Sequence, residues 1–290
     1  MTGAIAPAAV GAGGAVLVTG ATGAVGRFVV EALRARQVTV REAVTRIDPS
    51  GSSAQCRFAF EDSTTWSSAL SGVDRVFLMR PPAISDVKGV ILPFVDELAR
   101  RSIASTVVLS VMGVNPAVPH WQLERGVKAS GLPWTMLRPA FFMQNLETAY
   151  RVDIRDHDRI RLSAGNGKTS FIDTRDIADV AAAALTCPGA HASRAYTLTG
   201  GRALGWHAVA SMLSAELGRP IGYEPISLLA SRREMRAAGL PDAYVNVQLL
   251  ISIVARVGLA ASVSDEVSTL LGRPPRDLRS YIHETARTWA

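Results

Sequence analysis

The chain has 290 residues, of which 48% are hydrophobic and 19% charged, so it can bury a substantial core and is not a disordered polypeptide. Its net charge of +6 comes almost entirely from arginine and gathers in no continuous basic run, which argues against nucleic-acid binding. Cys56 and Cys187 are its two cysteines. Because they lie far apart, we expect no disulfide framework and no metal site, and a cytoplasmic location.

Two segments bear on targeting and membranes. Residues 1–14 are rich in Ala and Gly and lack the basic start of a secretory signal, so we expect a loose N-terminal tail. The most apolar later run, 245–261, is interrupted by Asn246, Gln248 and Arg256. It is too short and too polar to span a bilayer, and it is predicted to be a core helix. We therefore expect no membrane partner.

The dominant motif occupies residues 15–27, where an apolar run leads through a glycine-rich turn into a helical pattern. Gly20, Gly23 and Gly26 would allow a tight turn, a close approach to a pyrophosphate and close helix–strand packing. The N-terminus of the helix would offer N–H groups to the phosphates. The alternative is an ordinary strand–helix turn, but the flanking patterns favour dinucleotide binding. The predicted contacts are Gly20, Thr22, Gly23, Ala24, Val25 and Gly26.

The second predicted strand, 38–45, ends at Thr45 and Arg46, about 20 residues beyond the glycine motif. At this place an acidic residue would bind the ribose 2′-hydroxyl, whereas an arginine accommodates a 2′-phosphate. Thr45 and Arg46 are therefore predicted cofactor contacts, and Arg46 favours NADP(H) over NAD(H). Asp48 competes for this role, although its place before Pro49 suits a turn-forming residue better.

Strands and helices alternate regularly through about residue 150. Strands are predicted at 55–59, 75–79, 106–109 and 135–137, and helices at about 61–70, 86–98 and 120–129. This alternation predicts an α/β fold with a Rossmann-type doubly wound parallel sheet over residues 15–150. Beyond it, helices are predicted at 177–185 and 206–217, strands at 196–198 and 222–226, and a helical final 60 residues. We expect residues 151–290 to form a smaller α/β substrate-binding region, whose strands can interleave with the first domain.

The residues that follow the predicted strands are further candidates for the cofactor site. Ligands of doubly wound sheets bind beyond the carboxyl ends of the strands. Cofactor contacts are therefore predicted at Arg80 and Pro81 after the fourth strand, Ser110 and Met112 after the fifth, and Pro139 after the sixth. For Ser110 a cofactor contact is favoured over a role as acid.

Three further stretches carry distinctive patterns. Residues 137–146 are Leu-Arg-Pro-Ala-Phe-Phe-Met-Gln-Asn-Leu, residues 171–178 are Phe-Ile-Asp-Thr-Arg-Asp-Ile-Ala, and residues 272–276 are Gly-Arg-Pro-Pro-Arg. Together with the glycine motif and Arg46, they resemble the NmrA-like atypical short-chain dehydrogenases over residues 15–290, particularly the branch of the type 2 NADPH quinone oxidoreductases. The resemblance implies a Rossmann domain, a small substrate domain and NADP(H) between them. The family contains hydride-transfer enzymes and proteins that bind the dinucleotide as a redox signal.

The expected catalytic pair of ordinary short-chain dehydrogenases is missing, because no tyrosine is followed four residues later by lysine. Some relatives place a lysine at the position of His120 and an acidic residue at that of Glu124. These two residues share a helix face and are the predicted catalytic residues. His120 could donate a hydrogen bond or a proton to a developing oxyanion. The alternative is an exposed histidine at a helix start, with Glu124 paired to Arg125.

The aromatic run after the sixth strand is predicted to border the ligands. Phe141 is a candidate cofactor contact, and Phe142 and Asn145 are candidate substrate contacts. Aromatic residues at a strand–helix junction are equally often part of a core, and that alternative stays open.

The missing tyrosine and lysine favour a planar, electron-poor substrate, because quinones and conjugated enones spread the charge delivered by a hydride. We predict an NADPH-dependent oxidoreductase that reduces a quinone-, enone- or aromatic polyketide-like small molecule. The alternatives are an NADP(H)-sensing regulatory protein without turnover and a cofactor-dependent isomerase, epimerase or dehydratase. No appended nucleic-acid-binding helix pair is predicted, which favours an enzyme. A homodimer is a possible assembly.

Overall fold

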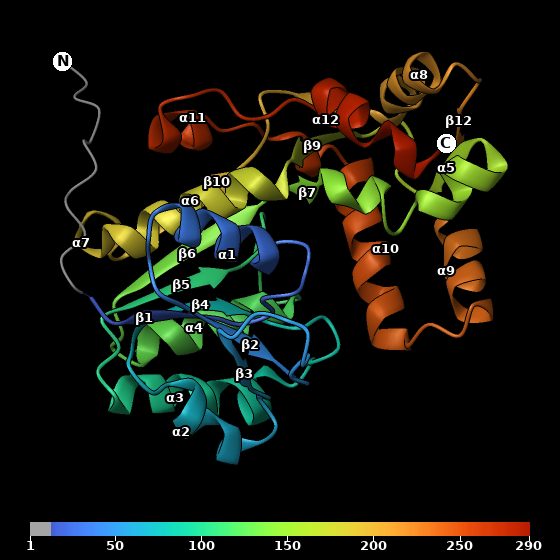
Figure 1. Cartoon of the computed structure of the whole chain (residues 1–290). Helices are drawn as coiled ribbons and strands as arrows, with labels where there is room; N and C mark the ends of the chain where they lie inside the picture. The colour runs from blue at the N-terminus through green and yellow to red at the C-terminus, as the bar shows by residue number, and fades with distance from the viewer. Residues whose placement is uncertain (1–12) are drawn as a thin grey trace. The chain divides into compact units, whose positions relative to one another are not determined.

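The main sheet has seven strands in the computed structural model, which describes residues 13–290 (Figure 1). The strand order is β10-β6-β5-β4-β1-β2-β3, and every pairing among β1 to β6 is parallel. Its strands are β1 (Ala15–Val18), β2 (Val40–Val44), β3 (Gln55–Arg57), β4 (Val73–Met79), β5 (Ser105–Leu109), β6 (Trp134–Pro139) and β10 (Arg194–Leu198). The order confirms the predicted Rossmann-type doubly wound sheet.

Helices cover both faces of this sheet, and its central strand β1 is accordingly apolar and buried throughout. Figure 1 shows α1 and α6 over one face and α2, α3 and α4 over the other. The helices that accompany the sheet are α1 (Gly26–Ala35), α2 (Trp66–Ala69), α3 (Leu92–Arg100), α4 (Pro119–Ala129), α6 (Thr174–Thr186) and α7 (Pro188–His191). Phe94 of α3 is fully buried and meets the rings of Phe58 and Trp66 edge-on, with centroids 4.9 and 5.4 Å away.

The chain divides into two compact units. The first comprises residues 1–139, 175–197 and 269–272, and the second comprises residues 140–174, 198–268 and 273–290. The segment with α6 and β10 belongs to the first unit because β10 adds to the sheet beside β6. The sequence analysis allowed strands beyond residue 150 to interleave with the first domain, but it did not indicate which strand pairs with β6.

The second unit has two small sheets and a set of helices. Its strands are β7 (Phe141–Phe142), β8 (Arg159–Leu162), β9 (Lys168–Ile172), β11 (Ala203–Gly205) and β12 (Gly222–Pro225). Its helices are α5 (Arg151–His157), α8 (Trp206–Leu217), α9 (Leu228–Ala237), α10 (Asp242–Arg256), α11 (Glu266–Leu271) and α12 (Leu278–Thr285). Trp289, near the C-terminus, is fully buried and donates its indole N–H to the carbonyl of Leu146 at 2.9 Å.

The apolar run 245–261 is not the core helix that the sequence predicts. Most of it forms α10, where Val245 is buried but Ile251 and Ile253 are about 40% exposed, and Leu259 beyond the helix is 69% exposed. The run has apolar residues on all sides, whereas the elements that contact it cover only part of its surface. Within residues 13–290 no single helix is long and apolar enough to cross a membrane, but the pair Tyr244–Arg256 and Leu259–Leu271, bent by 76°, meets length and composition criteria together.

The predicted N-terminal tail falls mostly on residues 1–12, which lie outside the described residues. Its last residue is held in place, because Gly14 N–H donates to a carboxylate oxygen of Asp74 at 2.7 Å. The Gly14 carbonyl also accepts from Arg75 Nη2 at 2.6 Å. A loose tail that includes Gly14 is therefore wrong, since both polar groups of this residue are bonded to β4.

Candidate dinucleotide site

The turn between β1 and α1 has the geometry that the glycine spacing predicts. Gly20 has a φ of +63°, and the N–H of Gly23 donates to the Gly20 carbonyl at 2.9 Å, which closes the turn. A Cβ at Gly26 would lie 2.1 Å from the same carbonyl oxygen. Helix α1 therefore starts directly against the turn, and only glycine fits at Gly26.

The N-terminus of α1 is suited to an anion. Its first turn contains no acidic residue, and Val25 at the N-cap provides no side-chain hydrogen bond. The N–H groups of Arg27 and Phe28 donate to the carbonyls of Gly23 and Val25 at 3.2 and 3.0 Å, so an anion here would meet the N–H groups of the turn just before them and the partial positive charge of the helix dipole. Thr22 and Ala24 are exposed beside these groups, while Val25 is buried. The predicted pyrophosphate contact at this end of the helix stays a prediction.

Thr19 is a site residue that the sequence reasoning missed. It is fully buried, and its hydroxyl oxygen accepts from the Met79 N–H at 2.7 Å and lies 3.1 Å from the Phe77 carbonyl. These bonds tie the carboxyl end of β1 to that of β4. The strand order reverses between these two strands, and doubly wound sheets bind ligands at such a point. A polar residue directly after a buried strand was the signal available in the sequence.

Thr45 and Arg46 lie exposed at the carboxyl end of β2, next to β1 in the sheet. Within residues 13–290, Arg46 has no ion-pair partner. Asp48 forms the predicted turn, because its carboxylate accepts from the N–H of Ser50 at 2.9 Å and from its hydroxyl at 2.7 Å. These hydrogen bonds lower the pKa of the Asp48 carboxyl. The available side chain at this position is therefore the arginine.

The loop after β4 is held by Arg80. Its Nη1 donates to the carbonyls of Pro81 at 3.0 Å and Ile84 at 2.6 Å. These hydrogen bonds fix the backbone of the loop around the guanidinium. Nε of Arg80 is buried and has no partner among the described residues. Burial lowers the pKa of this guanidinium from its ordinary value. Pro81 is half-buried next to it.

Ser110, Glu124 and Arg138 form a buried network that joins the carboxyl ends of β5 and β6 to α4. The Ser110 hydroxyl donates to Glu124 Oε1 at 2.7 Å. Arg138 binds the same carboxylate with two groups, Nε to Oε1 at 2.9 Å and Nη2 to Oε2 at 2.6 Å. Burial raises the pKa of Glu124, but the hydrogen bonds from Arg138 and Ser110, with the charges of Arg138 and Lys128, lower it overall. Glu124 is thus a carboxylate with both oxygens occupied.

His120 lies half-buried in the first turn of α4. Burial, together with the positive charge of Arg80, lowers its pKa to about 4, although Glu124 acts in the opposite direction. The alternative pairing of Glu124 with Arg125 is wrong, because the Arg125 guanidinium lies over the Trp121 ring, 4.6 Å from its centroid. At neutral pH, His120 is an uncharged imidazole that can donate one hydrogen bond.

The remaining predicted residues lie at the end of β6 and beyond it. Met112 N–H donates to the Pro139 carbonyl at 2.9 Å in the first unit. Phe141, in the second unit, is half-buried and packs edge-on against Phe171 and Trp206, with centroids 5.5 Å away in both cases. Its ring therefore takes part in the core of that unit, as the open alternative allowed. The other two predicted residues there, Phe142 and Asn145, are also half-buried.

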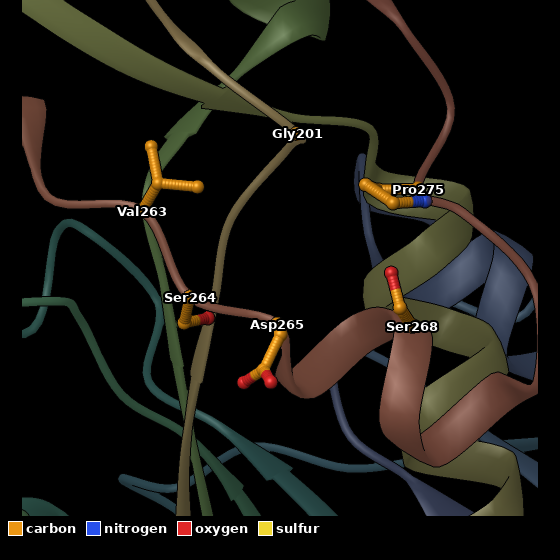
Figure 2. A pocket seen from close by; sticks show the side chains of 6 residues that line it. All are labelled: Gly201, Val263, Ser264, Asp265, Ser268 and Pro275. Atoms are coloured by element: carbon orange, nitrogen blue, oxygen red, sulfur yellow. The ribbon is translucent and has the colours of Figure 1, made fainter.

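A pocket of about 470 Å³ opens within the second unit (Figure 2). Its lining residues are Gly201, Val263, Ser264, Asp265, Ser268 and Pro275, none of them a predicted site residue. Figure 2 shows Ser268 on α11 with Pro275 beside it, Val263 on the opposite side, and Asp265 between them. The backbone here is held by Thr199, whose hydroxyl oxygen accepts from Ser264 N–H at 3.0 Å.

Comparison with known proteins identifies the family. Residues 13–270 match the NmrA-like family. The chain is 32% identical over 277 residues to the NAD(P)H azoreductase of Xenophilus azovorans, covering 92% of this chain and 96% of that protein. It is 33% identical over 294 residues to the (4-alkanoyl-5-oxo-2,5-dihydrofuran-3-yl)methyl phosphate reductase of Streptomyces griseus, covering 95% and 99%. The structure of the Escherichia coli NADPH-dependent quinone oxidoreductase with NADPH has the same fold, with a TM-score of 0.78 and 23% identity over 93% of this chain and 99% of that one. The chain, as its glycine motif and the run 137–146 predict, belongs to the NmrA-like family.

Proposed function

We propose that this protein is an NADP(H)-dependent oxidoreductase that reduces a quinone-, enone- or aromatic polyketide-like molecule by hydride transfer. The observation that carries the proposal is the glycine turn at the point where the strand order reverses, with Arg46 exposed just after the neighbouring strand β2 and without an ion-pair partner within residues 13–290. Family members support it. One is named as an NAD(P)H azoreductase, and another is named for reducing an oxo-dihydrofuran, a ring in which a carbon–carbon double bond is conjugated to a carbonyl.

The residues present fit the dinucleotide at both of its charged parts. The space that a Cβ at Gly26 would fill is closed by the backbone of Gly20, so α1 begins directly against the turn, and we propose that the pyrophosphate binds there. Arg46 would bind the 2′-phosphate. When bound, the dinucleotide supplies the hydride. The further proposed contacts are Thr45, Arg80, Pro81, Ser110, Met112, Pro139 and Phe141 for the cofactor, and Phe142 and Asn145 for the substrate.

His120 is the proposed stabiliser of negative charge on the substrate. Its neutral imidazole would donate a hydrogen bond to the oxygen that becomes negative as the hydride arrives. With a pKa of about 4 it is not a source of protons near pH 7, so the reduced substrate takes its proton from solvent. A quinone or conjugated enone can accept the hydride first and the proton later, because the anion formed in between is delocalised. The proposal narrows the predicted role of His120 to hydrogen bonding.

Replacing His120 with alanine is expected to lower kcat by about 100-fold, because one donor to the developing oxyanion is lost. His283→Ala is the matched control, since His283 is an exposed histidine of α12. The wild-type kcat should show no ionisation of His120 between about pH 6 and 8. A kcat that falls as the pH rises through this range, and does so only when His120 is present, would show that the protonated form is the active one.

The same histidine makes a prediction about stability. Its pKa is lowered in the folded state, so between about pH 6.5 and 4 the unfolded chain binds a proton that the folded chain does not. The stability that the neutral, buried His120 contributes is fully present above the pKa of this histidine in the unfolded chain, about 6.5, and is lost as the pH falls toward 4. His120→Gln should therefore reduce the loss of thermal stability between these two pH values, which thermal unfolding at each pH would measure.

The proposed reaction is tested by NADPH oxidation against a panel of quinones, conjugated enones, aromatic polyketide-like ketones and simple ketones, with product identification. We expect turnover with the planar, electron-poor acceptors and little with simple ketones. Tight NADP(H) binding without oxidation by any acceptor would favour the redox-sensing alternative. Conversion of a substrate without net NADPH consumption would favour an isomerase, epimerase or dehydratase. The homodimer and the cytoplasmic location stay predictions.

A further inference from the structure

The network of Ser110, Glu124 and Arg138 has a fixed hydrogen-bond direction. An ionised carboxylate can only accept, so the short contact of 2.7 Å between Ser110 Oγ and Glu124 Oε1 requires the serine to donate. A serine hydroxyl has a single hydrogen. Once that hydrogen points to Glu124, only the lone pairs of Ser110 remain for another group.

Arg138 is the residue that keeps Glu124 ionised. Its two hydrogen bonds occupy both carboxylate oxygens, and Glu124 is only 4% exposed, so solvent does little to stabilise the charge. The other groups that face this carboxylate are Lys128 and His120, both from α4 itself. Lys128 lies 3.7 Å away and is 41% exposed, so it is a weaker partner, and the imidazole of His120 is neutral.

We propose that Arg138 and Glu124 are positioning residues that turn Ser110 into an acceptor, so that Ser110 receives a hydrogen bond from an N–H or O–H donor of the dinucleotide. The inference rests on the proposed function for the placement of the cofactor at the carboxyl end of β5. In this arrangement Ser110 accepts a hydrogen bond, whereas a serine that acts as an acid would donate one to the substrate. The donor is the carboxamide of the nicotinamide or a hydroxyl of its ribose.

The pH dependence of NADPH binding tests this arrangement in the full-length protein. Arg138→Gln removes the charge and both hydrogen bonds of the guanidinium, so the pKa of the buried Glu124 should rise into the measurable range. As the pH falls from about 8.5 to 5.5, the Kd for NADPH of this variant should increase by about tenfold more than that of the wild type, because protonated Glu124 no longer takes the Ser110 hydrogen. Binding is followed by NADPH fluorescence.

Three variants separate positioning from a merely structural role. Lys128→Gln removes the exposed cation and should leave the pH profile of Kd unchanged. In Arg138→Gln/Glu124→Gln the titrating group is gone, so the profile should again run parallel to that of the wild type. Arg138→Lys should restore part of the wild-type profile. An Arg138→Gln profile parallel to that of the wild type, whatever its thermal stability, would overturn the proposal.

A cofactor analogue identifies the donor. In the 3-acetylpyridine analogue of NADPH a methyl group replaces the carboxamide NH2. If the carboxamide is the donor, Ser110→Ala should weaken NADPH binding about tenfold and leave the analogue unaffected. Equal losses for both would place the donor on the ribose, and no loss for either would overturn the proposal. Because these tests measure binding, they stand even if no acceptor is reduced, in which case the proposed reaction alone would fail.

Discussion

Replacing Arg46 with alanine is expected to raise the Kd for NADPH by about 10- to 100-fold and to leave the Kd for NADH nearly unchanged. The reason is the loss of charge-assisted hydrogen bonds to the 2′-phosphate, each of which contributes about 1.5–3 kcal/mol. Arg46 is exposed at the carboxyl end of β2 and has no ion-pair partner within residues 13–290, so the substitution breaks no other interaction there. Fluorescence titration of both dinucleotides measures the ratio.

Arg57→Ala is the matched control for this substitution. Arg57 lies at the end of β3, the neighbouring strand, with a side chain that is 69% exposed, so its removal changes the net charge equally. It should leave the preference for NADPH intact. If Arg46→Ala and Arg57→Ala weaken NADPH binding to the same extent, the effect is one of overall charge, and the assignment of Arg46 to the 2′-phosphate is wrong.

Replacing Gly26 with alanine is expected to remove NADPH binding and to destabilise the first unit. The new Cβ would lie 2.1 Å from the carbonyl oxygen of Gly20 and 3.0 Å from the Cα of Ala21. Both neighbours are backbone, so the turn or α1 must move. Overpacking of this kind costs about 1–3 kcal/mol or more, and it displaces the N–H groups that would bind the pyrophosphate. Thermal unfolding and NADPH titration measure the two effects.

Gly189→Ala provides the control for a glycine substitution as such. A Cβ at Gly189, in the short helix α7, meets no atom within 4 Å, so alanine should be tolerated with unchanged NADPH binding. An intermediate result is expected for Gly23→Ala, whose Cβ would approach the Gly20 carbonyl oxygen at 3.2 Å. A Gly26→Ala protein with the wild-type melting temperature and Kd would contradict the close packing of α1 on the turn.

Several features were determined by short stretches of sequence. The tight turn at Gly20 and the close packing at Gly26 follow from their spacing behind a buried strand. The turn at Asp48 follows from its place before Pro49. Asp86 was predicted to start a helix, and its carboxylate accepts from the Gly89 N–H at 2.9 Å at the beginning of a π-helical turn that leads into α3. In each case the partners lie within about six residues of one another, so the local pattern contains all that is needed.

The tertiary structure decided what depends on partners far apart in the chain. Thr19 meets Met79 only because β1 and β4 are neighbours in the sheet. Glu124 meets Arg138 because α4 returns the chain beside β6, and this pairing replaces the local one with Arg125. The partners in these two pairs are 60 and 14 residues apart in the sequence, so no helical or strand periodicity predicts their contact.

Burial was the other property that the sequence alone could not supply. The residue type of His120 indicated a group that titrates near neutral pH, but its desolvation beside Arg80 lowers that pKa to about 4. The apolar run 245–261 indicated a core helix, but its neighbours leave Ile251 and Ile253 partly exposed. The glycine motif and Arg46 thus predicted a dinucleotide phosphate site, which the two binding experiments above test. The tertiary structure decides which polar groups are charged and to which acceptors their hydrogens are donated, because both depend on the atoms that folding brings around them.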